Sequence, residues 1–312
     1  MTIPLPKLDD LTKGTKVEVT VSGTLSESSG GFRMWLADGT STASDTDICV
    51  RSLGNTTHRW VTTWGTAEEK CSIKENDDRM PNLPLEDTTV RQIIRVTTGG
   101  EKLRLRLSNQ YGESDVTVKS LHLAKQVKAD ASTIDTATDQ VVTVNGTEEF
   151  VIPKGKVIVT DPVDFSVNAL ENIAITSYFG ASPTKNITGH RGARATTYQV
   201  SGNHVSDETL TEPKTTLSWF FLADASIWST KESKAVVCFG DSITDGYGTD
   251  ADYLGKKPDS YTRWVDCFAK RLQENDKTKH FAMTTALKCT ARRSFRLERV
   301  LITVMLLKKC GR

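Results

Sequence analysis

Long apolar runs are missing from this sequence, and so is a net charge of either sign. No stretch approaches the roughly 20 consecutive apolar residues that a membrane-spanning helix requires, and the first residues, Met1–Lys7, lack the apolar run of a signal peptide. The 312 residues include 40 basic and 39 acidic side chains, so the whole chain does not attract nucleic acid or an anionic membrane. We therefore expect neither nucleic acid nor a membrane as a partner.

Closely spaced cysteine pairs are missing as well. The six cysteines form no C-x-x-C pair, which argues against a zinc site and against a redox-active dithiol. Cys238 lies in a run of apolar residues and is expected to be a buried free thiol. We expect no metal ion and no cofactor.

Short segments in which apolar and polar residues alternate fill the sequence from its start to about residue 230. The alternation has period two in Lys16–Val21, Leu103–Leu107 and Val116–Val118, as in strands with one buried and one solvent-facing side. Asn145-Gly146 suits a tight hairpin turn. So many short strands favour a β-sandwich of the jelly-roll type. Further strands are expected at residues 141–144, 150–152, 156–159, 165–167, 173–178 and 217–222.

The pattern changes at Ser229–Lys234, a polar connector that we interpret as a domain boundary near residue 230. Ala235–Phe239 is apolar on both faces, as a buried strand of a parallel sheet requires. His280–Met283 is expected to begin the next parallel strand and so to complete one βαβ unit. The predicted organisation is a strand-rich segment at 1–57 without an assigned role, a β-sandwich at 58–230 and a partial α/β domain at 231–312.

A helix is expected between these two parallel strands. It runs from Tyr261 to about Gln273, and Ser260 is placed to cap it. Asp266 and Lys270 are spaced to form an ion pair on its solvent side.

The heptapeptide Gly-Asp-Ser-Ile-Thr-Asp-Gly at 240–246 follows the first of these strands. Catalytic groups of open α/β sheets gather at the carboxyl ends of the strands, so Ser242 is placed where a nucleophile is expected. Its own backbone N–H and those of the loop can face a developing oxyanion.

Four neighbours of Ser242 are expected to support it. Gly240 lets the chain turn without a side chain, and Asp241 and Asp245 can accept loop N–H bonds. Gly246 closes the heptapeptide.

Three other interpretations of the heptapeptide are weaker. A phosphate-binding P-loop requires four residues between its glycines and a lysine after the second, whereas five residues separate Gly240 from Gly246 and Tyr247 follows. The G-x-S-x-G elbow of α/β-hydrolases requires glycine where Thr244 stands. An ordinary strand-to-loop turn stays open as the structural alternative.

The segment Val236–Gly246, followed by Trp264 and an amphipathic helix, resembles the first sequence block of the SGNH (GDSL) ester hydrolases. Residues 89–95 and 103–112 also resemble the β-domain that precedes the catalytic domain in some bacterial and fungal members, so the resemblance covers about 58 to 283. It implies a flavodoxin-like catalytic domain, an acyl-serine intermediate on Ser242, and a small ester or acetylated saccharide as substrate. It also favours a secreted protein.

Three later blocks of that family have no counterpart in this sequence: a glycine, an asparagine and an Asp-x-x-His pair. No asparagine, aspartate or histidine follows Asn275, Asp276 and His280, respectively, and Gly311 is the only later glycine. A catalytic triad therefore cannot be assembled from the residues after the helix.

The tail from Lys288 to Arg312 has eight basic residues against the single acid Glu298. We interpret it as the result of a change of reading frame near residue 284, which leaves a truncated catalytic domain with an atypical basic tail at 284–312. A basic membrane or nucleic-acid anchor is less favoured, because the apolar run at 300–307 is too short to span a bilayer. Comparison of the three reading frames of the encoding DNA tests this hypothesis.

His190 or His204 of the β-domain could supply the missing base, since triads are defined by geometry and not by order. A lone loop histidine is more often a polar surface residue.

Two functions remain open. The first is a serine ester hydrolase or a fragment of one. The second is a non-catalytic β-sandwich that binds carbohydrate by stacking sugars on tryptophan rings, beside a degenerate hydrolase remnant. The tryptophans considered for stacking also alternate with apolar neighbours, which favours a place in the core; they are Trp35, Trp60, Trp64 and Trp219.

Overall fold

The computed structural model describes residues 57–72, 85–251 and 255–287, together with three further strands. It divides the chain into two compact units, 1–56 and 57–312. In the first unit, β1 (Phe32–Met34) and β2 (Ile48–Val50) pair antiparallel. The strand predicted at Lys16–Val21 and the residue Trp35 lie outside the described residues, and the segment 1–57 keeps no assigned role.

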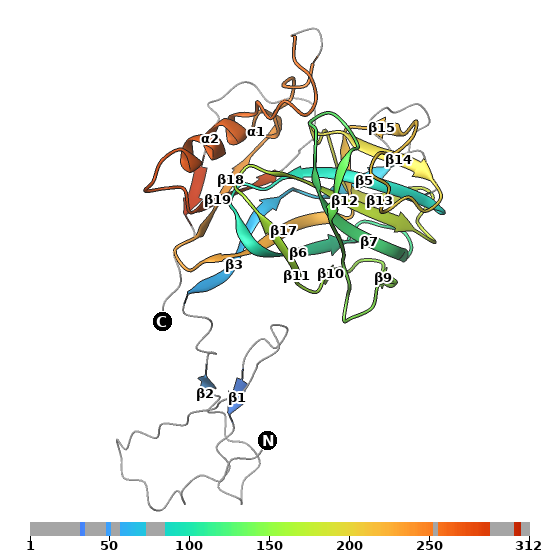
Figure 1. Cartoon of the computed structure of the whole chain (residues 1–312), viewed down its shortest axis with the longest axis horizontal. Helices are drawn as coiled ribbons and strands as arrows, with labels where there is room; N and C mark the ends of the chain where they lie inside the picture. Colours follow the sequence, from blue (N-terminus) through green and yellow to red (C-terminus); the bar gives the residue numbers. More distant parts are fainter. Residues whose placement is uncertain are drawn as a thin grey trace, which may run out of the picture. The chain divides into compact units, whose positions relative to one another are not determined.

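The second unit is mostly β, as the alternating pattern predicts (Figure 1). One sheet has five strands in the order β10-β6-β17-β3, with β11 paired to β6. These strands are β3 (His58–Gly65), β6 (Gly100–Ser108), β10 (Val157–Val159), β11 (Val163–Val167) and β17 (Leu222–Thr230).

A seven-stranded sheet has the order β15-β14-β5-β12-β7-β8, with β9 paired to β7. Its strands are β5 (Thr88–Arg95), β7 (Val116–Gln126), β8 (Ile134–Val141), β9 (Phe150–Ile152), β12 (Asn172–Phe179), β14 (Thr197–Ser201) and β15 (Lys214–Thr216). All pairings in these two sheets are antiparallel.

One apolar core joins the two large sheets. Leu103, Leu105 and Leu107 of β6 point into it, and Arg104 and Arg106 between them point away. This arrangement is that of a β-sandwich. The core residues include Leu103, Leu105, Leu107 and Ile227 from the first sheet and Val90, Ile94, Leu121, Leu123, Ile173 and Ile175 from the second.

Two strand predictions need correction. The strand predicted at 141–144 ends at Val141, and beyond it Val144 and Thr147 form only an isolated bridge around Asn145-Gly146. Both turn residues have positive φ, 53° and 76°, so the predicted tight turn is confirmed. The strand predicted at 217–222 is split, because Phe221 has φ 57° and interrupts the extended backbone.

The interruption at Phe221 separates β16 (Ser218–Phe220) from β17. β16 belongs to a three-stranded sheet with β13 (Asn186–Arg191) and β4 (Glu69–Ser72), in the order β16-β13-β4.

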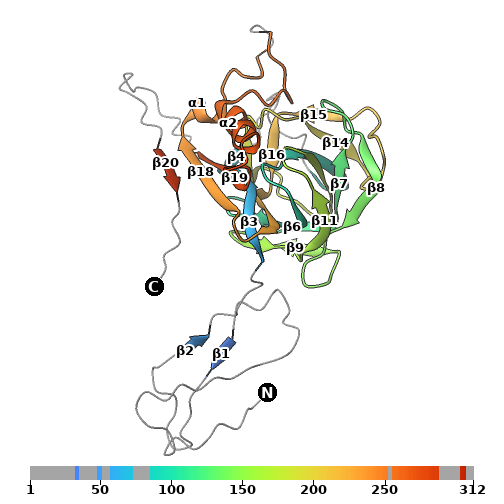
Figure 2. The same ribbon diagram turned by 60° about the vertical axis from the view of Figure 1, so that its left-hand side comes forward.

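The predicted parallel strand pair is confirmed. β18 (Lys234–Gly240) runs parallel to β19 (Phe281–Leu287), and β20 (Thr303–Leu306) pairs antiparallel with the other edge of β18. Two helices lie in the connection: α1 (Ser242–Asp245) follows the end of β18, and α2 (Trp264–Gln273) lies beside the strand pair (Figures 1 and 2).

The apolar side of α2 packs on the strand pair and buries Val265 and Ala269 against Val236, Cys238 and Met283. One parallel pair is less than a flavodoxin-like domain requires, so that part of the fold prediction stays a prediction.

The start of α2 differs from the prediction. Ser260 does not cap the helix, because Tyr261 has φ 48° and the helix begins only at Trp264. Arg263 is the N-cap, and its guanidinium binds the Asp266 carboxylate at 2.8 and 3.0 Å. Asp266 is thus used at the helix start, where a carboxylate also suits the helix dipole, and not in the predicted pair with Lys270.

We call residues 231–287 together with β20 the α/β segment. It belongs to the same compact unit as the β-sandwich. Thr97 of the sandwich binds both backbone groups of Met283 in β19 through its hydroxyl, at 2.9 Å to the carbonyl oxygen and 2.7 Å to the N–H. The predicted boundary coincides with the end of β17 at Thr230, and whether the sandwich folds alone stays a prediction. No helix among the described residues is long and apolar enough to cross a membrane.

Candidate functional site

Ser242 is the first residue of α1, separated from the carboxyl end of β18 only by Asp241, and it is exposed. The Asp241 carboxylate caps this single helical turn by accepting the N–H of Ile243 at 3.0 Å. Gly246 ends the turn in the left-handed conformation, with φ 85°. We call residues 240–250 the serine loop.

Both glycines of the heptapeptide lie against side chains. A Cβ on Gly240 would approach Oγ1 of Thr244 to 2.1 Å, and Thr244 is buried. A Cβ on Gly246 would approach Cγ of Arg263 to 2.3 Å. The sequence predicts that Gly240 lets the chain turn, but it does not predict the contact of Gly246 with Arg263, which lies seventeen residues further along the chain.

Asp245, the last residue of α1, is bound by two side chains of the β-sandwich, those of His190 and Arg194. His190 at the end of β13 contacts Oδ1 through Nε2 at 2.8 Å, and Arg194 contacts Oδ2 through Nη2 at 3.1 Å. All three side chains are largely buried. Asp245 was expected to accept N–H bonds of its own loop; instead its carboxylate joins the loop to the sandwich.

Both ring nitrogens of His190 are occupied. Nδ1 lies 2.8 Å from the carbonyl oxygen of Ala67, opposite the Nε2 contact with Asp245. A carbonyl and an ionised carboxylate both only accept, so both contacts are hydrogen bonds when the ring carries both protons. The ring also stacks on Trp219, with centroids 6.0 Å apart. In this arrangement neither nitrogen can take a proton from Ser242.

The loop between β13 and β14, residues 192–196, binds two further aspartates of the α/β segment. Arg194 contacts both oxygens of Asp250 through Nη1, at 3.1 and 2.9 Å. Asp259 accepts the N–H of Thr196 at 2.8 Å and its hydroxyl at 2.5 Å, and donates its own N–H to the carbonyl oxygen of Arg194. The sequence offered no local signal for these contacts, because they join residues more than fifty positions apart.

Other histidines do not supply a base to Ser242 among the described residues. The Ser242 hydroxyl makes no hydrogen bond within the described part of the chain. His204 pairs with Asp207 at 2.7 Å in the turn after β14. The thiol of Cys238 is buried in β18 as predicted, and burial raises its pKa to about 11, which leaves it protonated at neutral pH.

One Ser-His-Asp group does lie in the β-sandwich, but it has the wrong geometry for a triad. Ser206 Oγ and the Asp139 carboxylate both contact Nδ1 of His122, at 3.4 and 2.9 Å, and Ser206 donates to Asp139 at 2.9 Å. A triad requires the serine and the carboxylate on opposite ring nitrogens. This group is a polar contact between β7, β8 and the loop after β14.

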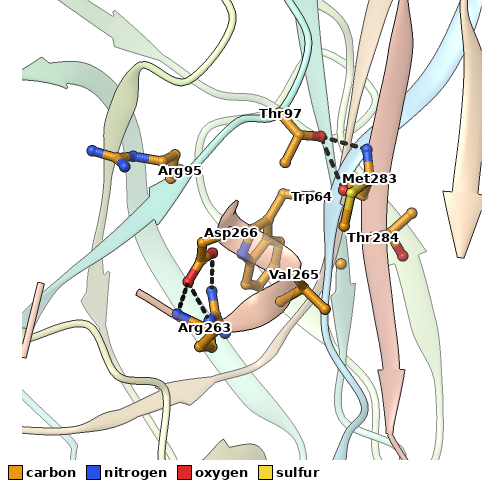
Figure 3. Close-up of a pocket in the computed structure, with 9 residues that line it drawn as sticks. Trp64, Arg95, Thr97, Arg263, Val265, Asp266, Met283 and Thr284 are labelled. Carbon is orange, nitrogen blue, oxygen red and sulfur yellow. Dashed lines mark hydrogen bonds and ion pairs between the residues drawn. The ribbon is translucent and has the colours of Figure 1, made fainter. Parts of the chain in front are cut away.

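A small cavity of about 30 Å³ lies where α2 meets the sandwich (Figure 3). Trp64 and Arg95 line it from the sandwich, and Arg263, Asp266 and Thr284 line it from the α/β segment. Ligand pockets commonly measure about 300–1,000 Å³, whereas this volume suits about one or two water molecules. The cavity is therefore too small to hold a substrate of that size.

The tryptophans considered for sugar stacking separate into two groups. Trp64 and Trp219 are buried and meet edge to face at 4.9 Å, so for them the core interpretation is confirmed. Trp60 is half-buried on the side of the five-stranded sheet that faces away from the core, next to Trp228 at 5.3 Å.

No protein-family model and no curated protein matches the chain. Within the described residues, no group of three or more His, Cys, Asp and Glu side chains is placed to hold a metal ion. The case for a function therefore depends on the geometry of the serine loop.

Proposed function

We propose that the chain carries the nucleophile of a GDSL-type serine ester hydrolase, with Ser242 as the attacking residue. The observation that supports this most directly is the position of Ser242. Its exposed hydroxyl lies on the first turn after the carboxyl end of a parallel strand, and Asp241 and Gly246 fix that turn from either side.

In the proposed reaction, Oγ of Ser242 attacks the carbonyl carbon of a small acyl ester. The bond to the alcohol oxygen breaks, the serine proton passes to a base and then to the leaving alcohol, and water hydrolyses the acyl-serine. By resemblance, acetylated carbohydrate is the favoured substrate class. The base is the open part of the proposal, because both nitrogens of His190 are already bound.

A fluorophosphonate probe tests the proposal within one chain. Prolonged incubation followed by peptide mass spectrometry compares Ser242 with Ser260, which is also exposed and serves as an internal control. We expect modification of Ser242 to be about tenfold faster or more, because backbone N–H groups of the loop can stabilise the negative charge that develops on the phosphonyl oxygen in the transition state. The adduct should disappear in Ser242→Ala, and equal modification of the two serines would argue against a nucleophile.

A second candidate function is binding of carbohydrate by the β-sandwich. It is favoured by Trp60 and Trp228, which lie side by side on the outer side of the five-stranded sheet with the Arg104 guanidinium 4.4 Å from the centre of the Trp60 ring. Aromatic rings beside polar groups bind sugar rings by stacking. Affinity electrophoresis in soluble polysaccharide gels should then show retardation that Trp60→Ala and Trp228→Ala remove, whereas the exposed Tyr111→Ala leaves it unchanged.

A further inference from the structure

Three aspartates of the α/β segment converge on one short stretch of the β-sandwich. Asp245 and Asp250 of the serine loop bind Arg194, and Asp259 binds Thr196. His190 adds the second contact to Asp245. Each of these three carboxylates thus accepts hydrogen bonds from residues within 190–196. We call residues 190–196 the receptor stretch.

The receptor stretch is built to present these donors. Gly192 has φ 83° and lies so close to Arg194 that an added Cβ would approach Nη2 to 3.0 Å. Arg194 itself has φ 58°, a left-handed conformation that is uncommon for residues other than glycine. Its side chain is 11% exposed and reaches two carboxylates that are 14% and 12% exposed. A strained backbone and a buried charge are both costly, so they persist where the surrounding contacts offset the cost.

We infer that the β-sandwich positions the serine loop through this receptor stretch, with Arg194 and His190 as positioning residues that act on Ser242 through Asp245. Asp245 is three residues after Ser242 in the same helical turn, so a shift of its carboxylate moves the serine. Naming Ser242 as the positioned group depends on the proposed function, whereas the docking of the loop does not.

Hydrogen–deuterium exchange of the full chain tests the docking. In Arg194→Lys, which keeps the charge but loses the planar fork, amides of residues 241–250 should exchange about ten- to hundredfold faster. Exchange in β12 should not change, and this confirms that the variant is folded. Arg106→Lys is the matched control, because Arg106 also binds a carboxylate, that of Asp224, but on another sheet. This variant should leave the exchange of residues 241–250 unchanged.

A double-mutant comparison tests whether His190 and Arg194 both act through Asp245. His190→Gln should also accelerate exchange of the serine loop, and its combination with Arg194→Lys should be non-additive, because both residues act on Asp245. Exchange of residues 241–250 within about twofold of the unmodified chain in both single variants would overturn the inference, since buried charged hydrogen bonds contribute more than that.

The fluorophosphonate rate at Ser242 separates the inference from the proposed function. If Ser242 is modified selectively, Arg194→Lys should lower its rate by about tenfold towards that of Ser260, while exchange in β12 stays unchanged. If Ser242 is never selective but exchange accelerates, the hydrolase proposal fails and the docking stands. If Ser242 stays fully selective in Arg194→Lys, the positioning role is wrong and the hydrolase proposal stands.

Discussion

The side chain of Arg263 lies over Gly246, so close that a Cβ on the glycine would be 2.3 Å from Cγ of the arginine. This contact joins the start of α2 to the end of the serine turn. Arg263 cannot move away easily, because its guanidinium is bound to Asp266 and buried.

Gly246→Ala should therefore lower the free energy of unfolding by more than left-handed strain alone, which costs about 1–2 kcal/mol. Gly146→Ala is the matched control, since Gly146 also has positive φ, 76°, but no atom lies within 4 Å of an added Cβ. Urea denaturation of both variants measures the difference, which we expect to be about 1 kcal/mol or more. Equal losses would show that Arg263 gives way without cost.

Arg91 should be among the most important polar residues of the sandwich. It is completely buried and donates to Thr176 and to four backbone carbonyls, those of Ser132, Val205, Asp207 and Glu208. Burial lowers its pKa to about 10, so it stays charged at neutral pH.

Arg91→Met should remove about 3 kcal/mol or more of unfolding free energy, because it leaves several buried acceptors without donors. Lys119→Met, at an exposed pair with Glu149, should cost less than about 1 kcal/mol. Thermal and urea unfolding compare the two, and a loss at Arg91 no larger than that at Lys119 would contradict the prediction.

Asp259 should give the unfolding free energy a distinct pH dependence. Burial raises the pKa of its carboxyl above the ordinary 3.8, and the hydrogen bonds from Thr196 offset this only in part. The folded state therefore holds this proton to a higher pH than the unfolded state does. Its contribution to stability is complete below pH 3.8 and is lost as the pH rises through the folded-state pKa.

Asp259→Asn removes this titration. The stability of the variant relative to the unmodified chain should therefore rise with pH from about 3.8 upward and then level off above the folded-state pKa. Urea unfolding at a series of pH values measures the difference. A difference independent of pH would mean that Asp259 titrates alike in both states.

Catalytic turnover should be low. An unactivated serine hydroxyl is a weak nucleophile, and a site that lacks only its base retains about 10³- to 10⁴-fold catalysis over water. Here the later glycine and asparagine that would complete the oxyanion hole also have no counterpart in the sequence, and each such donor contributes about 10²- to 10³-fold. We expect the 312-residue chain to hydrolyse p-nitrophenyl acetate barely above background. If turnover is instead rapid and Ser242→Ala removes it, a base completes the site, and His190→Ala and His204→Ala are the next variants to assay.

The α/β segment should be less protected than the sandwich. Its described strands are a parallel pair with β20 at one edge, and its core is small compared with the core that joins the two large sheets. In hydrogen exchange, β18, α2 and β19 should exchange before β5 and β12, and a fragment ending at Thr230 should fold. Uniform protection along 57–287, or an insoluble fragment, would contradict this.

Local patterns in the sequence predict most elements of the fold. Alternation at Leu103–Leu107 predicts β6, Asn145-Gly146 predicts the turn, and the apolar run at Ala235–Phe239 predicts a strand with a parallel neighbour. These features depend on residues within a few positions of one another. The errors arise where one residue with positive φ interrupts a predicted strand or helix, as Phe221 and Tyr261 do. Neither residue type favours positive φ, so the sequence gives no sign of the interruption.

The candidate site could be predicted only in part, for the same physical reason. Ser242 and its cap Asp241 are adjacent in sequence, so the turn can be inferred from residue types. The partners of Asp245 cannot be inferred in this way, because His190 and Arg194 are more than fifty residues away in the sequence and belong to β13 and the loop after it. The contacts of His190 with Asp245 and with the carbonyl oxygen of Ala67 occupy both ring nitrogens of one of the two histidines that were considered as a substitute base.

The docking of three aspartates on residues 190–196 also limits how the chain can be re-engineered. A chimaera that joins residues 231–312 to a different β-sandwich would lack the donors that hold Asp245 and Asp250. The heptapeptide would be intact by sequence yet would leave two buried carboxylates without partners. Residues 190–196 and the serine loop must therefore be transferred as one unit, although fifty residues of chain separate them.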